Sequence, residues 1–176
     1  RDADYRMAVS VAENSAVLLK NEQGVLPLAK DCKAVFIGEF AEHPRYQGGG
    51  SSHVNSAKVS CALEHAPGVT YAQGYRTDKD TVDPMLEQAA VAAAADADVA
   101  VIFAGLPERY ESEGYDRTTL AMPENQNHLI AAVAAVQPNT VVVLHNGSAV
   151  EMPWIDDVPA VLELYLAGDG VGKAAV

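Results

Sequence analysis

Several features that assign a chain to a specialised class are scarce or missing in this sequence. Its 176 residues include 12 lysines and arginines against 24 acidic residues, for a net charge of −12. The basic residues are scattered along the chain, which argues against a nucleic-acid partner and against an anionic membrane surface. No apolar run approaches the ~20 residues that a membrane-spanning helix needs. A globular chain that binds neither nucleic acid nor membrane is therefore expected.

Cysteine and histidine are also few, and their spacing predicts neither a disulfide nor a metal site. Cys32 and Cys61 are the only 2 cysteines and form no CxxC motif, so two buried thiols are favoured over a bridge. The 5 histidines are not at i, i+4 helical spacing and no cysteine joins them. A phosphate loop at residues 168–173 is excluded because Ala174 stands where Ser or Thr is required. We expect no metal and no cofactor.

The location of the protein follows only indirectly from these patterns. Free thiols favour a reducing compartment, and the first ten residues have neither the cationic nor the apolar part of a signal peptide. A cytoplasmic protein is therefore expected. Because Arg1 is not a natural start, a removed leader and a secreted or periplasmic protein remain open.

Hydrophobic residues make up 49% and charged residues 20% of the chain, which is typical of one globular domain with a full core. Helical periodicity alternates with short apolar runs of strand length, and this alternation predicts an α/β fold. We expect a mostly parallel sheet flanked by helices on both faces. We assign residues 1–30 to a linker helix and lead-in, and residues 31–176 to the α/β domain. Helices are expected at 3–20, 57–66, 83–95 and 123–135, with the first turn of another at 173–176. Strands are expected at 34–37, 69–73, 99–103, 140–144 and 160–165.

The stretch from 99 to 123 is the centre of the chain's functional prediction. An apolar strand, VAVIF, leads into a loop that carries acidic and basic side chains. Ligands of open α/β sheets bind beyond the carboxyl ends of the strands, so this loop lies where a site is expected. A solvated acidic loop is the competing interpretation. The charged residues concerned are Glu108, Arg109, Glu111, Glu113, Asp116 and Arg117.

Two further loops follow predicted strands. Residues 48–52, with sequence GGGSS, combine backbone freedom for a close approach to a ligand with two hydroxyl groups, although a flexible turn explains them equally well. Residues 145–148 form a second polar cluster after the strand at 140–144. We call residues 48–52 the glycine loop.

Four separated motifs together resemble the second, sandwich-like α/β domain of family 3 glycoside hydrolases of the β-glucosidase type. The final segment, 167–175, resembles the family's next segment, and the motifs span nearly the whole chain. The matching stretches are 15–21 (SAVLLKN) with 24–28 (GVLPL), the glycine loop, 113–117 (EGYDR) and 147–154 (GSAVEMPW).

The resemblance implies a retaining, exo-acting β-glycosidase whose aspartate nucleophile belongs to a preceding barrel domain that this chain does not contain. It implies a carbohydrate substrate, the barrel domain as a partner, a possible homo-oligomer, and an α/β domain truncated at its C-terminus. Retaining chemistry needs two carboxyl groups about 5–5.5 Å apart, of which this chain supplies one.

The same resemblance assigns roles to individual residues. Glu113 falls on the acid/base position, with Glu111 as second choice. Gly49, Gly50, Ser51 and Ser52 form part of the sugar pocket. Asp116 and Arg117 are expected to brace the loop as a charge pair. Neighbouring carboxylates would raise the pKa of Glu113 and the nearby arginines would lower it, so its direction stays open.

Two other functions compete with this one. A non-catalytic α/β module could hold a small molecule or carbohydrate at its strand ends without turning it over. A structural domain that packs on the barrel is the third alternative. A glutamate tuned to donate a proton is needed only in the enzyme, so Glu113 discriminates among the three.

Overall fold

The computed structural model describes residues 2–176, which form one six-stranded sheet with helices on both faces. The helices are α1 (Asp2–Ser15), α2 (Pro84–Ala95), α3 (Glu124–Ala134) and α4 (Val171–Ala174). The strands are β1 (Val17–Asn21), β2 (Ala34–Ile37), β3 (Thr70–Ala72), β4 (Val99–Gly105), β5 (Thr140–His145) and β6 (Ala160–Glu163). Short 3₁₀ helices occur at Glu39–Ala41, Gly50–Ser52, Ala62–Glu64, Glu108–Tyr110 and Gly168–Gly170.

The strands are ordered β1-β6-β5-β4-β2-β3, and every neighbouring pair is parallel except β1 with β6. β4 and β5 lie in the middle, and all their residues are buried. Strands buried on both faces are apolar throughout, which explains the VAVIFAG and TVVVLH sequences. The expected mostly parallel α/β fold is confirmed.

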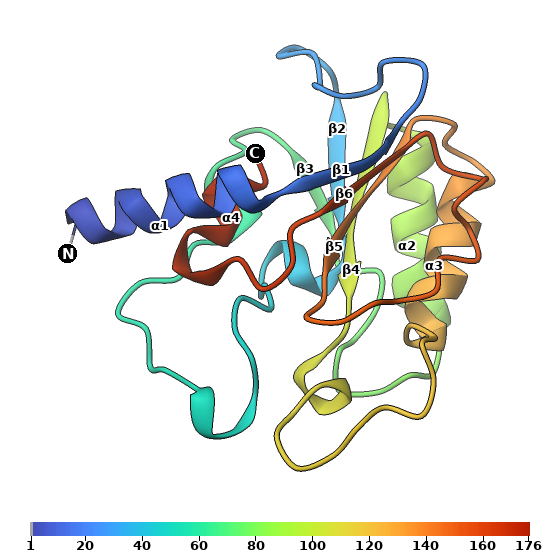
Figure 1. Ribbon diagram of the computed structural model, residues 1–176. Helices are drawn as coiled ribbons and strands as arrows, with labels where there is room; N and C mark the ends of the chain where they lie inside the picture. The colour runs from blue at the N-terminus through green and yellow to red at the C-terminus, as the bar shows by residue number, and fades with distance from the viewer. Residues whose placement is uncertain (1) are drawn as a thin grey trace.

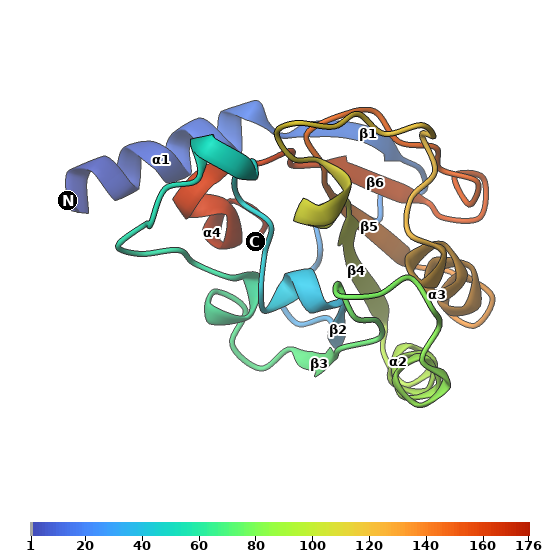
Figure 2. The same cartoon turned by 90° about the horizontal axis from the view of Figure 1, so that it is seen from below.

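Alternate residues of each central strand point to opposite faces and build two separate cores. On one face α2 and α3 pack side by side over Val35, Ile102 and Val142 (Figures 1 and 2). On the other face Phe36, Phe103 and Val143 pack beneath Phe40 and Val171, on the side where α1 and α4 lie. The helices expected at 83–95 and 123–135 are therefore the cover of one face. The Asp83 carboxylate caps α2 as expected, accepting from the backbone N–H groups of Met85 and Leu86.

The helix expected over residues 3–20 is wrong in its last five residues. α1 ends at Ser15, and residues 17–21 form β1, which pairs antiparallel with β6. Lys20 is tied to this edge, because its ammonium donates to the carbonyl of Ile155 at 2.8 Å. The apolar residues before it fit either period, and the open edge of β6 decides in favour of a strand. Tertiary pairing here overrides local helical periodicity.

The helix expected at 57–66 is also wrong, since only Ala62–Glu64 forms a 3₁₀ turn. Its backbone is bound to a distant segment: the N–H of Ser60 donates to the carbonyl of Asp169 at 3.0 Å. Gly172 lies against the backbone of Cys61, where any side chain would collide. Both cysteines are free thiols, as expected, although each is half-buried and not buried.

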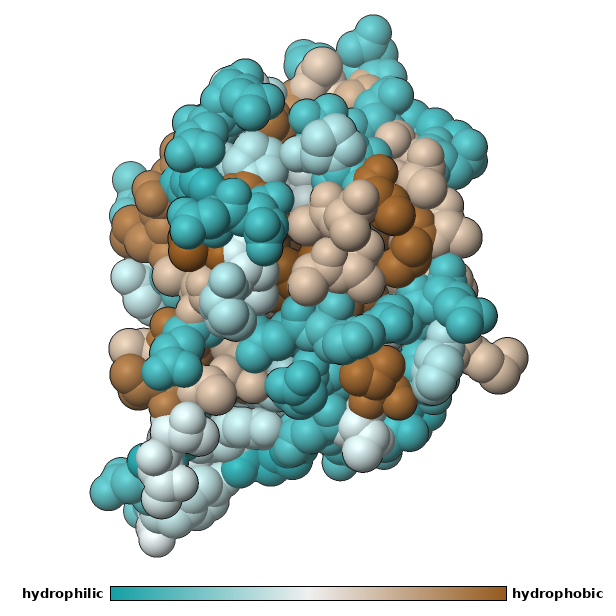
Figure 3. Space-filling model, turned by 90° about the vertical axis from the view of Figure 1, so that its right-hand side faces the viewer, coloured by the Kyte–Doolittle hydropathy of each residue, from teal (hydrophilic) through white to brown (hydrophobic). Residues whose placement is uncertain are grey.

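Within residues 2–176, no helix combines the length and apolar composition that would let it cross a bilayer. The same part of the chain contains no group of three or more His, Cys, Asp and Glu side chains arranged to hold a metal ion. From the side of α2 and α3, the surface is a mosaic of hydrophilic and hydrophobic residues (Figure 3).

Candidate functional site

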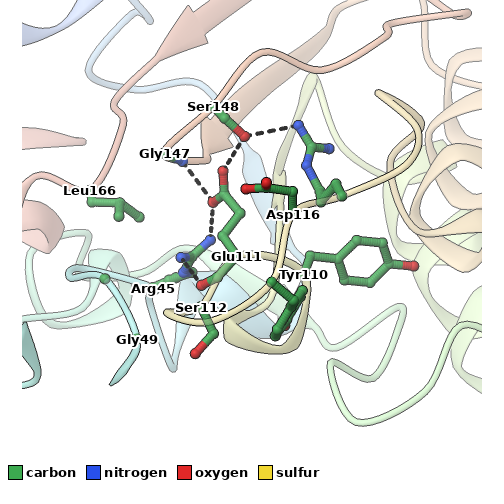
Figure 4. Close-up of a pocket in the computed structure, with 12 residues that line it drawn as sticks. Arg45, Gly49, Tyr110, Glu111, Ser112, Asp116, Gly147, Ser148 and Leu166 are labelled. Atoms are coloured by element: carbon green, nitrogen blue, oxygen red, sulfur yellow. Dashed lines mark hydrogen bonds and ion pairs between the residues drawn. The ribbon is translucent and has the colours of Figure 1, made fainter. Parts of the chain in front are cut away.

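Three loops converge at the carboxyl edge of the sheet. They follow β2, β4 and β5, which are neighbours in the sheet and run parallel, so their ends lie side by side. Between them is a cavity of about 350 Å³, the site cavity (Figure 4). We call residues 106–121, which follow β4, the acidic loop. The residues that line the site cavity are Arg45, Gly48, Gly49, Tyr110, Glu111, Ser112, Tyr115, Asp116, Arg117, Gly147, Ser148 and Leu166.

The acidic loop leaves β4 through a glycine that no other residue could replace. Gly105 has φ +139°, and a Cβ on it would collide with the backbone of His145. That close approach lets the N–H of Leu106 donate to the carbonyl of His145 at 3.0 Å. β4 and β5 therefore stay paired to their last residues, and their loops leave the sheet in contact.

Arg45 is the cation at the centre of the site, and sequence reasoning did not single it out. Its side chain is buried, and its guanidinium donates to the carbonyls of Leu106 at 2.7 Å and Glu111 at 3.2 Å. It also forms an ion pair with the Glu111 carboxylate. A buried arginine needs this many acceptors, because an unpaired cation in the interior is costly. The only sequence signal was its position before the glycine loop.

Glu111 uses both carboxylate oxygens in contacts with other loops (Figure 4). One oxygen accepts from Arg45 and from the N–H of Gly147, at 2.9 Å for the latter, and the other accepts from the Ser148 hydroxyl. Burial acts to raise the pKa of Glu111, but the hydrogen bonds from Ser148, Gly147 and Arg45 outweigh it. The pKa of Glu111 therefore lies below its usual value, and its ionised carboxylate links the acidic loop to the loops that follow β2 and β5.

Asn146, directly after β5, links the loop that follows β5 to β6. Its amide donates to the Glu163 carboxylate and to the carbonyl of Ser148, both at 3.0 Å. Glu163 is buried, and desolvation together with the nearby Glu111 charge raises its pKa. The segment after β5 is thereby joined to β6 by a polar contact.

Glu113 is placed quite differently, two residues further along the same loop. Its side chain is exposed, and among residues 2–176 it accepts hydrogen bonds from Ser51 alone, whose N–H lies 2.7 Å from the Glu113 carboxylate. The hydrogen bonds from Ser51 lower the pKa of Glu113, which answers the question of direction that the sequence left open. Neither arginine of the loop is responsible, since Arg109 pairs with Asp80 and Arg117 bonds elsewhere.

The glycine loop packs directly on the acidic loop. Gly50 has φ +81°, and a Cβ there would lie 2.5 Å from the Cβ of Glu113. At Gly49 a Cβ would lie 2.7 Å from the Glu108 side chain. Ser51 and Ser52 are exposed, and the Ser52 hydroxyl donates to the carbonyl of Gly49 at 3.2 Å. The glycines are thus required by contact with the acidic loop, whatever they also bind.

Asp116 and Arg117 both line the site cavity, but they do not form the expected charge pair in the described residues. Arg117 instead donates to the Ser148 hydroxyl at 2.8 Å and to the carbonyl of Ala149 at 2.5 Å. It braces the acidic loop against the segment after β5. Asp116 is exposed and directed at the cavity (Figure 4).

His145 belongs to the polar cluster expected after β5, yet its ring is buried beneath the site. It stacks on Phe103 at 6.1 Å between centroids and meets the edge of Phe40 at 5.8 Å. Burial lowers the pKa of His145 to about 4, so the imidazole is neutral at pH 7. This histidine is part of the core.

Comparison with known proteins gives the same assignment along almost the entire chain. Residues 16–176 match the model of the glycosyl hydrolase family 3 C-terminal domain. The chain is 51% identical over 181 residues to thermostable beta-glucosidase B of Acetivibrio thermocellus, covering 99% of this chain and 24% of that protein. It is 43% identical over 187 residues to an exo-alpha-(1->6)-L-arabinopyranosidase of Bifidobacterium longum, covering 98% of this chain and 25% of that one.

The fold is shared with a solved structure of this family. A GH3 beta-glucosidase of Bifidobacterium adolescentis superposes with a TM-score of 0.93 at 44% identity, over 98% of this chain and 26% of that one. The chain spans about a quarter of the length of the relatives that it matches. With its fold and nearly its full length matched, the chain belongs to glycosyl hydrolase family 3, as the C-terminal α/β domain.

Proposed function

We propose that the protein carrying this domain is a retaining, exo-acting β-glycosidase that hydrolyses terminal non-reducing β-D-glycosyl residues. Glu113 acts as the acid/base, and Gly49, Gly50, Ser51 and Ser52 close one side of the sugar pocket. The nucleophile is an aspartate of a barrel domain elsewhere in the same protein. Carbohydrate is the substrate, and neither metal nor cofactor takes part.

The observation that carries the proposal is the contrast between the two candidate glutamates. Both oxygens of Glu111 are occupied by Arg45, Gly147 and Ser148, so Glu111 has no free oxygen to aim at a glycosidic bond. Glu113 is exposed, and Ser51 is its one hydrogen-bond partner among residues 2–176. A general acid must reach its substrate oxygen, and Glu113 has the free oxygen and the exposure that this requires.

The protonation state of Glu113 fits a two-step reaction. The Ser51 contact lowers the pKa of Glu113 and favours the carboxylate, which is the form that activates water in the second step. In the first step the residue must carry a proton. Desolvation by a bound sugar and the charge of the nucleophile carboxylate both raise a carboxyl pKa, and together they supply the required shift.

The test is made on the full-length protein with Glu113→Ala. We expect kcat/KM for substrates with poor leaving groups to fall about 10²–10⁴-fold, and for activated aryl glycosides far less, because only the former need protonation. Azide, which needs no base, should restore turnover and yield a β-glycosyl azide. Rescue of Glu111→Ala in place of Glu113→Ala would transfer the role to Glu111. Full activity of both variants would contradict the proposal.

The sugar is proposed to be β-D-glucosyl, supported by the 51% identical relative of Acetivibrio thermocellus, which is named a beta-glucosidase. The arabinopyranosidase relatives make α-L-arabinopyranosyl the second candidate. Comparing kcat/KM of the full-length protein on aryl β-D-glucoside and aryl α-L-arabinopyranoside decides between them. Binding of a sugar without turnover of either substrate would favour the non-catalytic module.

A further inference from the structure

We propose that Arg45 and Glu111 are a positioning pair that holds Glu113 in its working place. The inference rests on the proposed function of Glu113 as the acid/base. Neither residue of the pair touches substrate in this mechanism. They act by fixing the two loops between which the Glu113 carboxylate lies.

Arg45 and Glu111 lie close in sequence to the two partners of the hydrogen bond between Ser51 and Glu113. Arg45 precedes the glycine loop, and Ser51, six positions after it, donates its N–H to Glu113. Glu111 stands two positions before Glu113 on the acidic loop. The ion pair between Arg45 and Glu111 therefore fixes the relative position of the Ser51 donor and the Glu113 acceptor.

The pair is far less exposed than the residue that it positions. The side chains of Arg45 and Glu111 are 6% and 14% exposed, whereas residues 113–116 are all exposed. Gly114 adds backbone freedom, with φ +95° and no atom within 4 Å of the Cβ it lacks. Apart from the contact of Glu113 with the glycine loop, the tip of the acidic loop is exposed, so its position depends on the pair behind it.

A third loop completes the device. Ser148 and the N–H of Gly147, after β5, both donate to Glu111, and Arg117 returns from the acidic loop to Ser148. Loops from three neighbouring strands thus meet at one carboxylate. Displacement of a catalytic group by about 1 Å can cost about 10²-fold in rate, which makes such a junction a determinant of activity.

The principal variant is Glu111→Gln in the full-length protein. The amide removes the charge that Arg45 requires while keeping the size of the side chain. We expect kcat/KM for poor leaving groups to fall about 10²-fold and kcat/KM for activated aryl glycosides to change by less than about 5-fold. Azide should have almost no effect, because the Glu113 carboxylate remains. Arg45→Lys, which keeps the charge and loses the fork of donors, should show the same pattern to a smaller extent.

The matched control is Asp80→Asn, which breaks the Arg109–Asp80 ion pair on the same acidic loop. In that pair the Arg109 guanidinium donates to both Asp80 oxygens, at 2.7 and 3.2 Å, but the two side chains are 36% and 46% exposed. We expect unchanged kcat/KM on both substrates. If Glu111→Gln fails to fold, Ser148→Ala removes one donor to the Glu111 carboxylate and should give the same leaving-group pattern at about 3–10-fold.

Distinct results separate this inference from the proposed function. If Glu113→Ala behaves as an acid/base variant and Glu111→Gln matches the parent, only the positioning role is wrong. Equal losses on both substrate types, accompanied by a lower melting temperature, would show that the pair is merely structural. Azide rescue of Glu111→Ala, with Glu113→Ala unaffected, would overturn both proposals.

Discussion

The carboxyl edge of the sheet and the face covered by α2 and α3 are held together by different forces. At the edge, Arg45 and Glu111 form a largely buried ion pair, and the Ser148 hydroxyl donates a hydrogen bond to Glu111. On the helical face, Leu129 and Ile130 of α3 and Ala90 and Ala94 of α2 pack into an apolar core. The same strands contribute to both regions. Their side chains form the core under α2 and α3, and the loops that follow them form the carboxyl edge.

The difference shows how a stable scaffold carries an adjustable site. Apolar packing is insensitive to pH and gives most of the folding free energy. Polar contacts at the edge are worth less individually, but they depend on geometry and charge, and they fix where Glu113 lies. Four substitutions test this division, and they are ordered here by the size of the expected effect.

Leu129→Ala should have the largest effect on stability. Leu129 is buried in α3 and packs beside Gly74 and Ile37, so its truncation leaves a cavity. We expect the free energy of unfolding to fall by about 2–5 kcal/mol. Urea unfolding at pH 7 measures it. A loss below about 1 kcal/mol would show that apolar packing under α2 and α3 contributes less to the free energy of unfolding than we expect.

His145→Phe should remove a pH dependence of the free energy of unfolding. The pKa of His145 is about 4 in the folded protein and about 6.5 in the unfolded chain, so the unfolded state binds the proton first. Stability of the parent should therefore fall as pH drops from about 6.5 towards 4, by roughly 2 kcal/mol at pH 5. The phenylalanine variant lacks this loss. Parallel urea curves at pH 7 and pH 5 that show no difference between the proteins would contradict the prediction.

Glu111→Gln should reveal the charge dependence of the edge. The folded pKa of Glu111 lies below its ordinary value, so the stability it contributes is present above the unfolded pKa of about 4.3 and lost as pH falls further. The stability gap between parent and variant should be widest near pH 7 and narrow below about pH 4. Denaturation curves across this range measure the gap. A gap independent of pH would mean that shape, and not charge, is what Glu111 contributes.

Glu113→Gln should have the smallest effect on stability. The side chain is exposed and keeps an oxygen for the Ser51 N–H, so the melting temperature should move by less than about 2 °C. In the full-length protein the same substitution should nonetheless abolish acid catalysis for poor leaving groups. A large loss of thermal stability would place Glu113 with the structural residues of the edge.

The sequence by itself determined the elements whose signals are local. The apolar runs of β4 and β5, the Asp83-Pro84 start of α2 and the alternation of strands with helices were sufficient to predict the fold class. The position of the acidic loop after β4 followed from the same pattern. These signals depend on residues close together in the chain, and a single sequence contains them.

Only the tertiary structure decided the contacts between distant segments. The open edge of β6 converts residues 17–21 from the expected helix into β1, and Asp169 holds residue 60 out of the expected helix. Glu111 and Glu113 have the same side chain two residues apart, and no local signal distinguishes them. Their roles separate because Arg45, 66 positions away in the sequence, lies beside one and not the other. Burial and long-range hydrogen bonding are properties of the folded chain, and they assign each glutamate its environment.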